Sequence, residues 1–386
     1  MREIYLDNSA TTKPLNNVVK IMMEYYQHKY GNPSSMHKMG IEAEKGIKFA
    51  RKEIAKFLKV EEEEIIFTSG GTESNNMAIQ GVVNRNKKRG NHIITTTIEH
   101  PSVLNIFKDL EKRGFEVSYL SVDKKGRINL EEIKSLVRKD TILVSVMMVN
   151  NEIGTIQPIK KIGKIIKENN SQCVFHVDGV QAFGKVPCYP KNMNIDLFTI
   201  SSHKIHGPKG VGALYKRRDL LIDPIILGGG QEVGIRSGTE NVPGIVGMGK
   251  AVENLNKNFE KNIKFLRLLR QRAKEKISEK IKNVSINGPT NLEEIAPHIL
   301  SVSFENIKGE VLLHSLEQDG IYVSTGSACS SKKKGSHVLK GIGLPDTFID
   351  GTLRISFSIL NKEEEVDILV ESLKKYVDLL RKIIRR

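Results

Sequence analysis

Short apolar runs alternate with amphipathic stretches through the middle of the chain. The runs are rich in Val, Ile and Thr and have the length of buried strands; they cover residues 64–68, 92–97, 115–120 and 141–148, and three more end at Asp178, Ile200 and Tyr215. The stretches between them repeat apolar residues at helical spacing, at 73–89, 102–113, 129–137 and 159–168. This alternation predicts an α/β fold with a mostly parallel seven-stranded sheet and helices on both of its faces.

The pattern changes after Gly249. A long charged helix is predicted at 250–282, and shorter elements follow it, with strands at 284–286, 299–304 and 352–357 and a helix at 310–318. The chain ends in an amphipathic helix that begins at Glu363, where a run of glutamates complements the helix dipole. These elements predict a smaller α+β domain. We therefore expect a large domain of residues 14–260 and a small domain of residues 1–13 and 261–386.

Composition narrows the class of protein. The chain has 386 residues, of which 39% are hydrophobic and 27% charged, and no apolar run approaches the roughly 18 residues that a membrane helix needs. Its first residues do not form a basic and then apolar signal sequence, so we expect a cytoplasmic protein. The net charge of +15 raises the alternative of an RNA-related role. Because the 60 basic residues are spread along the chain among 45 acidic ones, we expect no direct DNA binding.

Three cysteines are too few for a disulfide framework. Cys173 lies in an apolar run and is expected to be buried, and Cys188 has no evident chemical neighbours. Cys329 differs because glycine and small polar residues surround it, which predicts an accessible thiol. An accessible thiol is a liability unless its reactivity is used, so Cys329 is a candidate nucleophile.

A lysine stands at the centre of residues 201–210, between two apolar runs that predict strands. Burying its ammonium group costs free energy, so Lys204 is either solvated or used chemically. The chemical use is a Schiff base: desolvation lowers the pKa of a lysine, the neutral amine attacks an aldehyde, and pyridoxal phosphate supplies one. Ser201 and His203 would then bind the cofactor phosphate. The alternative is a solvated lysine in a surface connection.

Two further features strengthen the cofactor hypothesis. Residues 69–76 contain glycines, follow a strand and open a helix, which favours anion binding, although a plain helix start has the same pattern. Asp178 ends an apolar strand 26 residues before Lys204, and a carboxylate there would pair with a protonated pyridine nitrogen. Gln181 would reach the ring hydroxyl oxygen. The alternative for Asp178 is a turn or cap residue.

These residues belong to a series of motifs that runs nearly from end to end. The motifs are residues 5–12, 31–35, 67–76, 99–100, 149–158, 176–178 with Gln181, 201–210, 228–232, 236–239 and 326–329. In content and order they resemble the cysteine desulfurases, the fold-type I pyridoxal-phosphate enzymes that take sulfur from L-cysteine. The resemblance implies that fold, with pyridoxal 5′-phosphate as cofactor and L-cysteine as substrate.

The resemblance also implies a role for each cofactor-binding residue. Lys204 would bind the cofactor covalently and move protons at the substrate Cα and at C4′, and His100 would stack on the ring and act in acid/base steps. Asp178 and Gln181 would contact the ring nitrogen and the ring oxygen. The phosphate would be bound by Gly71, Thr72, Ser201 and His203, joined by Thr239 from the second subunit of a homodimer.

Substrate contacts and sulfur chemistry are implied in the same way. Asn151 would touch both cofactor and substrate, and Arg354 would bind the substrate carboxylate with its planar guanidinium. Cys329, in the small domain, would attack the substrate sulfur and leave alanine and a Cys329 persulfide. The spacing between Cys329 and residues 336–339 is similar to that of the long-loop subgroup, whose loop carries sulfur to acceptor proteins.

The sequence does not identify the protein that accepts the sulfur. An iron–sulfur scaffold and a tRNA-thiolation enzyme are the candidate acceptors, and no metal site of the chain's own is expected, although Cys329 would be able to ligate a cluster transiently with a scaffold. Two departures from the family pattern bear on partners and on the support of Arg354, namely residues 357–362 and the basic run 332–334. The alternatives are an aminotransferase, which needs no thiol, a selenocysteine lyase, and a non-catalytic protein that kept the fold.

Overall fold

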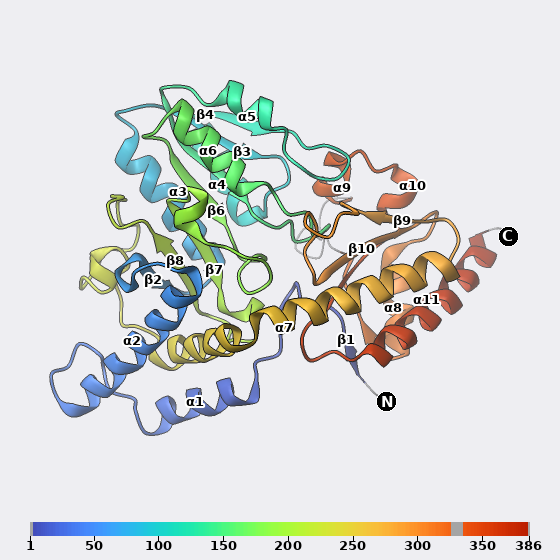
Figure 1. Ribbon diagram of the computed structural model, residues 1–386, viewed down its shortest axis with the longest axis horizontal. Coiled ribbons are helices and arrows are strands. Elements are labelled where there is room, and N and C mark those ends of the chain that lie inside the picture. Colours follow the sequence, from blue (N-terminus) through green and yellow to red (C-terminus); the bar gives the residue numbers. More distant parts are fainter. Residues whose placement is uncertain (1–2, 326–334, 385–386) are drawn as a thin grey trace.

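The computed structural model describes residues 3–325 and 335–384. Its larger half is built on a seven-stranded sheet in the order β2-β8-β7-β6-β5-β3-β4 (Figure 1). The strands are β2 (Ile65–Thr68), β3 (His92–Thr96), β4 (Glu116–Leu120), β5 (Thr141–Met147), β6 (Val174–Asp178), β7 (Leu197–Ser201) and β8 (Gly212–Lys216). Within this sheet β8 runs antiparallel to both of its neighbours and the other pairs are parallel, so the predicted mostly parallel sheet is confirmed.

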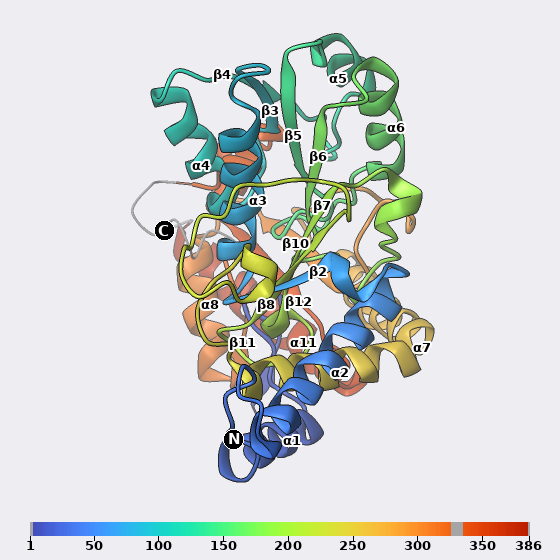
Figure 2. The ribbon, with the colours of Figure 1, turned by 90° about the vertical axis from the view of Figure 1, so that its left-hand side faces the viewer.

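Helices cover both faces of this sheet (Figure 2). One face is covered by α3 (Gly71–Asn86) and α4 (Pro101–Lys112), the other by α5 (Leu130–Leu136) and α6 (Ile159–Asn169). In α6 the buried residues Ile159, Ile162 and Ile166 recur every three or four positions. This spacing places them in one stripe that faces the sheet, which is the pattern that predicted the helix.

The smaller half contains a three-stranded antiparallel sheet in the order β12-β10-β9. Its elements are β9 (Val284–Asn287), β10 (Ile299–Phe304), β12 (Thr352–Ser356), the parallel pair β1 (Ile4–Tyr5) and β11 (Ile321–Tyr322), and the helices α8 (Gly309–Gln318), α9 (His337–Gly341), α10 (Asp346–Ile349) and α11 (Glu363–Ile384). The start of the chain therefore packs among C-terminal elements, and both ends of the chain lie at this half (Figure 1).

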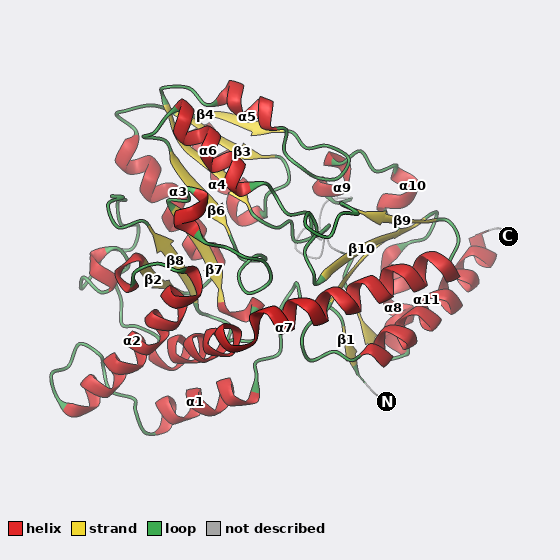
Figure 3. Cartoon of the chain, in the orientation of Figure 1, coloured by secondary structure: helices red, strands yellow, loops and turns green. Residues whose placement is uncertain are grey.

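One long helix, α7 (Val242–Lys280), joins the two halves (Figure 3). Its first part buries Val246 and Val252 in the core beneath the large sheet. Its second part buries Leu266 and Leu269 in a separate core that includes side chains of β10 and β12. The domain boundary at residue 260 stays a prediction, and this separation of the two cores along α7 supports it.

The sequence pattern did not predict two helices that precede the large sheet, α1 (Asn16–Gln27) and α2 (Lys38–Leu58). Both helices pack against α7. Glycines at 40 and 46 interrupt the apolar pattern of α2, but Gly46 lets the helices approach closely, because a Cβ there would lie 2.7 Å from side-chain atoms of Tyr25 and Val246. Tertiary packing thus outweighs the low helix propensity of glycine.

Candidate active site

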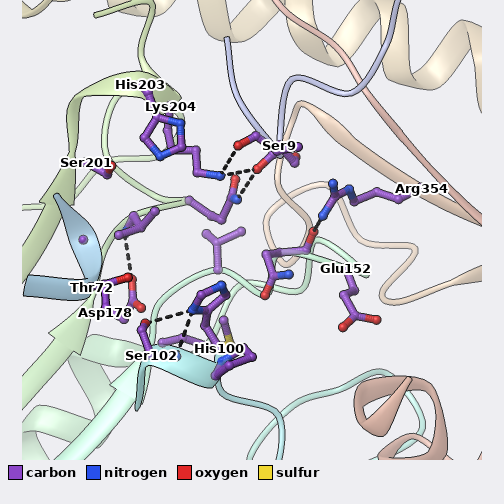
Figure 4. A pocket seen from close by; sticks show the side chains of 18 of the residues that line it. Ser9, Thr72, His100, Ser102, Glu152, Asp178, Ser201, His203, Lys204 and Arg354 are labelled. Carbon is purple, nitrogen blue, oxygen red and sulfur yellow. Dashed lines mark hydrogen bonds between the residues drawn. The ribbon is translucent and has the colours of Figure 1, made fainter. Parts of the chain in front are cut away.

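A cavity of about 310 Å³ lies at the carboxyl ends of the parallel strands, where the two halves of the molecule meet (Figure 4). Open α/β sheets bind their ligands at this edge. The predicted residues that line the cavity are Gly71, Thr72, His100, Asn151, Asp178, Gln181, Ser201, His203, Lys204 and Arg354. The fold therefore gathers side chains that are dispersed along most of the chain.

One predicted residue of the described chain, Thr239, is not part of this wall. Thr239 lies in an exposed connection between η4 (Glu232–Gly234) and α7. Cys329 lies outside the described residues. On either side of that part of the chain, Ser324 exchanges two backbone hydrogen bonds with Arg354, and His337 lines the cavity.

Lys204 ends η3 (Ser202–Lys204), the short 3-10 turn that follows β7. Its Nζ donates hydrogen bonds to the carbonyl oxygens of Ser9 and Ala10, the latter at 2.7 Å (Figure 4). Ser9 and Ala10 belong to the N-terminal segment (residues 6–12). This segment is bonded to the same turn, because the Thr12 N–H donates to the His203 carbonyl oxygen at 2.9 Å. The lysine amine is thus fixed in the cavity at the junction of the two halves.

His100 caps the N-terminus of α4. Its Nδ1 accepts a hydrogen bond from the backbone N–H of Ser102 at 3.1 Å, so the ring proton of the neutral form lies on Nε2. Burial lowers the pKa of His100, which keeps the ring neutral at pH 7. A neutral imidazole in this position is able to stack on an aromatic ligand and to exchange a proton with it.

Asp178 ends β6 and is 5% exposed. Its Oδ2 accepts from the side-chain amide of Asn75 and its Oδ1 from the backbone N–H of Val180, each at 2.9 Å. These two donors come from different elements and fix the carboxylate at the edge of the cavity. The site therefore offers an oriented acceptor for a ring N–H.

The cavity fits pyridoxal phosphate. The N-terminus of α3 has no side-chain cap and meets the cavity through Gly71 and Thr72, so its partial positive charge is available to a phosphate. The Ser201 hydroxyl is buried and has no hydrogen-bond partner in the described chain, as expected for a donor that binds a ligand oxygen. An amine at Lys204 and a carboxylate at Asp178 match the aldehyde and the pyridine nitrogen of this cofactor.

Arg354 lies on β12, on the side of the cavity that the smaller half of the molecule forms. Its Nη2 is 2.7 Å from Oδ1 of Asp7, and its Nη1 donates to the Asn151 carbonyl oxygen at 3.0 Å. Its Nε is buried and has no partner within the described chain. Because a guanidinium carries five N–H donors, Arg354 retains donors for a carboxylate ligand.

The sequence did not single out several polar residues of the wall, including Ser9, Glu152 and His337. Burial raises the pKa of Glu152 to about 7, and the Ser336 hydroxyl donates a hydrogen bond to its carboxyl group. Glu152 directly follows two asparagines after a buried strand, and this position was a usable signal. His337 carried no such signal, because its approach to the cavity depends on the packing of α9.

Glu99 is a buried acid next to the site. Its Oε1 accepts from the Thr96 hydroxyl and from the backbone N–H of Met147, each at 2.8 Å, and its Oε2 has no partner in the described chain. Burial raises the pKa of Glu99 to about 8. The folded protein therefore keeps the Glu99 proton at pH 7, whereas the unfolded chain, with an ordinary glutamate pKa, has lost it.

This difference predicts a pH-dependent stability. Between pH 5 and 7 the folded state binds the extra proton, so the contribution of Glu99 to the free energy of unfolding should fall by about 1.4 kcal/mol per pH unit as the pH rises. Glu99→Gln should remove this slope. The check is urea unfolding at saturating cofactor over that range, and parallel pH profiles for the two proteins would contradict it.

Within residues 3–325 and 335–384, no group of three or more His, Cys, Asp or Glu side chains is arranged to hold a metal ion. Over the same ranges, none of the helices has the length and apolar character needed to cross a membrane.

Comparison with known proteins gives consistent matches. Residues 4–369 match the family model described as aminotransferase class-V. A cysteine desulfurase IscS of Methanosarcina thermophila is 49% identical over 382 residues, which is 98% of this chain and 93% of that protein. Among solved structures, a NifS-like protein superposes with a TM-score of 0.92 at 42% identity and covers 98% of this chain and 100% of its own. A structure described as SspA in complex with cysteine gives a TM-score of 0.81 at 35% identity, with coverage of 92% and 99%.

Proposed function

Because the chain belongs to the class-V aminotransferase family and, within it, to the pyridoxal-phosphate-dependent cysteine desulfurases, we propose that the cavity takes L-cysteine and that its sulfur leaves as a persulfide on Cys329. The observation that carries the site assignment is the convergence of Lys204, Asp178 and Arg354 on one cavity. The experiment that tests it is the cysteine-dependent formation of alanine and persulfide in equal amounts.

The contacts of the cavity support the following cofactor roles. Lys204 would bind the cofactor aldehyde through its amine, Asp178 would accept from the ring nitrogen, and Gln181 would contact the ring oxygen. The phosphate would be held at the start of α3 by Gly71, Thr72, Ser201 and His203. When bound, pyridoxal phosphate supplies an electron sink that stabilises negative charge at the substrate Cα. The uncapped helix and the unpartnered Ser201 hydroxyl support this placement.

Proton transfer is assigned to two side chains. Lys204 would move the proton at the substrate Cα through its amine. His100 would stack on the ring and exchange a proton through Nε2, since its Nδ1 already accepts a hydrogen bond from the Ser102 N–H. The lowered pKa of His100 suits this exchange near neutral pH, because the uncharged ring is the resting form.

Substrate recognition is assigned to Arg354, with Asn151 beside it. Arg354→Lys should raise KM for L-cysteine by about 10- to 100-fold and change kcat much less, since an ammonium cannot contact Asp7, Asn151 and a carboxylate with the same geometry. Steady-state alanine formation measures both constants. Arg272→Lys, at an ion pair of α7 with α11, is the matched control. An unchanged KM would show that the carboxylate binds elsewhere.

The sulfur step is assigned to Cys329. Its thiolate attacks the substrate sulfur, the Cβ–S bond breaks, and the bonding electrons remain on carbon, which takes up a proton and becomes the methyl group of alanine. The sulfur atom, now oxidised, stays on Cys329 as a persulfide. Ser324, which is hydrogen-bonded to Arg354 of the cavity wall, and His337, which lines the cavity, stand on either side of this part of the chain and support the assignment.

A homodimer is the proposed assembly, with Thr239 completing the phosphate site of the second subunit. Large apolar side chains are exposed on α1 and α2 and on the connection between β8 and α7, namely Val19, Met23, Tyr26, Met39, Ile41, Leu221, Leu227 and Val233. Burial of such surfaces is a common basis of stable association. Light scattering should give about twice the 43.3 kDa mass of one chain.

The acceptor of the sulfur is proposed to be an iron–sulfur scaffold or a tRNA-thiolation enzyme. Loading Cys329 with radiolabelled sulfur from L-cysteine, removing small molecules and adding each purified acceptor would discriminate between them. Transfer to one acceptor and retention of label in the presence of the other identifies the pathway. Retention with both would reject the two candidates together.

A further inference from the structure

We propose that Asp7 is a positioning residue for substrate recognition. It fixes the guanidinium of Arg354 so that the remaining N–H groups meet the α-carboxylate of L-cysteine. The inference rests on the proposed role of Arg354 and adds the residue that orients it. The two residues are 347 positions apart in the chain, and the crossing of the N-terminal segment into the C-terminal half brings them together.

The contacts of the guanidinium define its orientation. Arg354 Nη2 donates to Asp7 Oδ1 at 2.7 Å, and Nη1 donates to the Asn151 carbonyl oxygen at 3.0 Å. The Arg354 side chain is 6% exposed, so water competes little for these donors. A charge-assisted hydrogen bond in such a place orients the planar group strongly. The Nε–H and one N–H on each terminal nitrogen remain for other acceptors.

The remaining donors are directed to a ligand. Arg354 and Asn151 line the cavity, whereas Asp7 does not. The Arg354 Nε is buried and without a partner among the described residues, and such a donor calls for an acceptor that binds there. A substrate carboxylate therefore approaches from the cavity while Asp7 retains its contact from outside it.

Asp7 is itself held in place. Its carbonyl oxygen accepts from the Ala10 N–H at 3.0 Å and from the Tyr5 hydroxyl at 3.2 Å. The Ser356 N–H, two residues beyond Arg354 on β12, donates to the Leu6 carbonyl oxygen at 2.7 Å. The N-terminal segment that carries Asp7 is thus hydrogen-bonded to β12, the strand that carries Arg354. The carboxylate site is preorganised before substrate binds.

The test compares Asp7→Ala and Asp7→Asn with a matched control in the holoenzyme. The control is Asp367→Asn, because Asp367 pairs with Arg272 at the same 2.7 Å but away from the cavity. Asp7→Ala should raise KM for L-cysteine by about 10-fold and change kcat by less than about threefold, as the loss of one oriented charged contact implies. Asp7→Asn keeps an acceptor oxygen and should raise KM by about threefold. The control should match the wild type.

Binding of a second ligand distinguishes a loss of Arg354 positioning from a general folding defect. Cysteamine has the amine and thiol of cysteine but no carboxylate, and its binding is followed by the change in cofactor absorbance. Its Kd should stay unchanged in both Asp7 variants. A general structural defect would weaken cysteamine and cysteine alike, and that result would overturn the inference. Asp7→Asn serves alone if Asp7→Ala fails to fold, and an unchanged KM in a folded Asp7 variant would also overturn it.

Combining Asp7→Ala with Arg354→Lys tells the two claims apart. If the residues act as a unit, Arg354→Lys raises KM and the second substitution adds little to it. Full additivity would mean that Asp7 acts independently, which overturns the inference and leaves the role of Arg354 intact. If Arg354→Lys alone does not change KM, the proposed substrate site itself is wrong.

Discussion

A Lys204→Ala enzyme should lose the visible absorbance of covalently bound pyridoxal phosphate and nearly all turnover, a fall of at least about 1,000-fold. Among the described residues that line the cavity, Lys204 is the sole lysine. Lys185 is buried close by, but its Nζ donates to the Lys204 carbonyl oxygen at 3.2 Å and it is not part of the wall. Within residues 3–325 and 335–384, no second amine of the cavity wall is available to replace Lys204 in covalent binding or in proton transfer.

Absorbance spectra and alanine formation check this result. Lys209→Ala is the matched control, because Lys209 is an exposed lysine of the same connection between β7 and β8. It should keep both the absorbance band and the activity. A Lys204→Ala protein that retains the band, or more than a small residue of turnover, would remove the basis of the cofactor assignment.

The pattern of apolar residues along the chain predicted most strands of the large sheet, and there is a physical reason for this. Strands such as β5 and β6 are buried on both faces, so each reads as a continuous apolar run that needs no tertiary information. The direction of β8 was beyond such reasoning, because direction depends on the length and path of the connection. The helices α1 and α2 were missed since their packing on α7 is decided by contacts distant in sequence.

Some residues of the candidate site could be predicted from local sequence pattern, and others could not. Lys204 and Asp178 could be predicted as site residues because each lies at or just after the carboxyl end of a predicted strand, and these ends meet at one edge of the sheet. The sequence did not predict the Asp7–Arg354 ion pair or the hydrogen bond between Ser336 and Glu152. The Asp7–Arg354 pair joins the two ends of the chain within the smaller half, and the Ser336–Glu152 contact forms only where the two halves pack together. The hydrogen-bond and ion-pair partners of the predicted residues are therefore the part of the site that only the structure identifies.

Residues 357–362, which depart from the family pattern, also show their role only in three dimensions. Asn361 donates to the Tyr5 carbonyl oxygen at 3.0 Å and accepts from the Ser358 N–H at 2.7 Å. Phe357 is fully buried in the small-domain core. The segment thus anchors the start of the chain just before Asp7. The support of Arg354 is maintained through the N-terminal segment, despite the altered sequence.

A Cys329→Ser enzyme is expected to separate cofactor chemistry from sulfur transfer. It should bind pyridoxal phosphate and still change its absorbance when L-cysteine is added, because those events are assigned in the proposed function to Lys204, His100 and Asp178. Alanine formation should fall by more than about 1,000-fold, since an alcohol is a far poorer nucleophile toward sulfur than a thiolate. Activity close to that of the wild type would mean that the sulfur leaves without a Cys329 persulfide.

The other two cysteines make this test decisive. Both are fully buried, and burial raises the pKa of Cys173 to about 12 and that of Cys188 to about 12, so neither provides a thiolate at neutral pH. After incubation with L-cysteine and removal of small molecules, mass spectrometry should therefore locate the added sulfur on the peptide that contains Cys329. Cys173→Ala and Cys188→Ala should leave that modification unchanged. A persulfide on either buried cysteine, or its persistence in Cys329→Ser, would contradict the mechanism, because a protonated and inaccessible thiol would then have performed the attack.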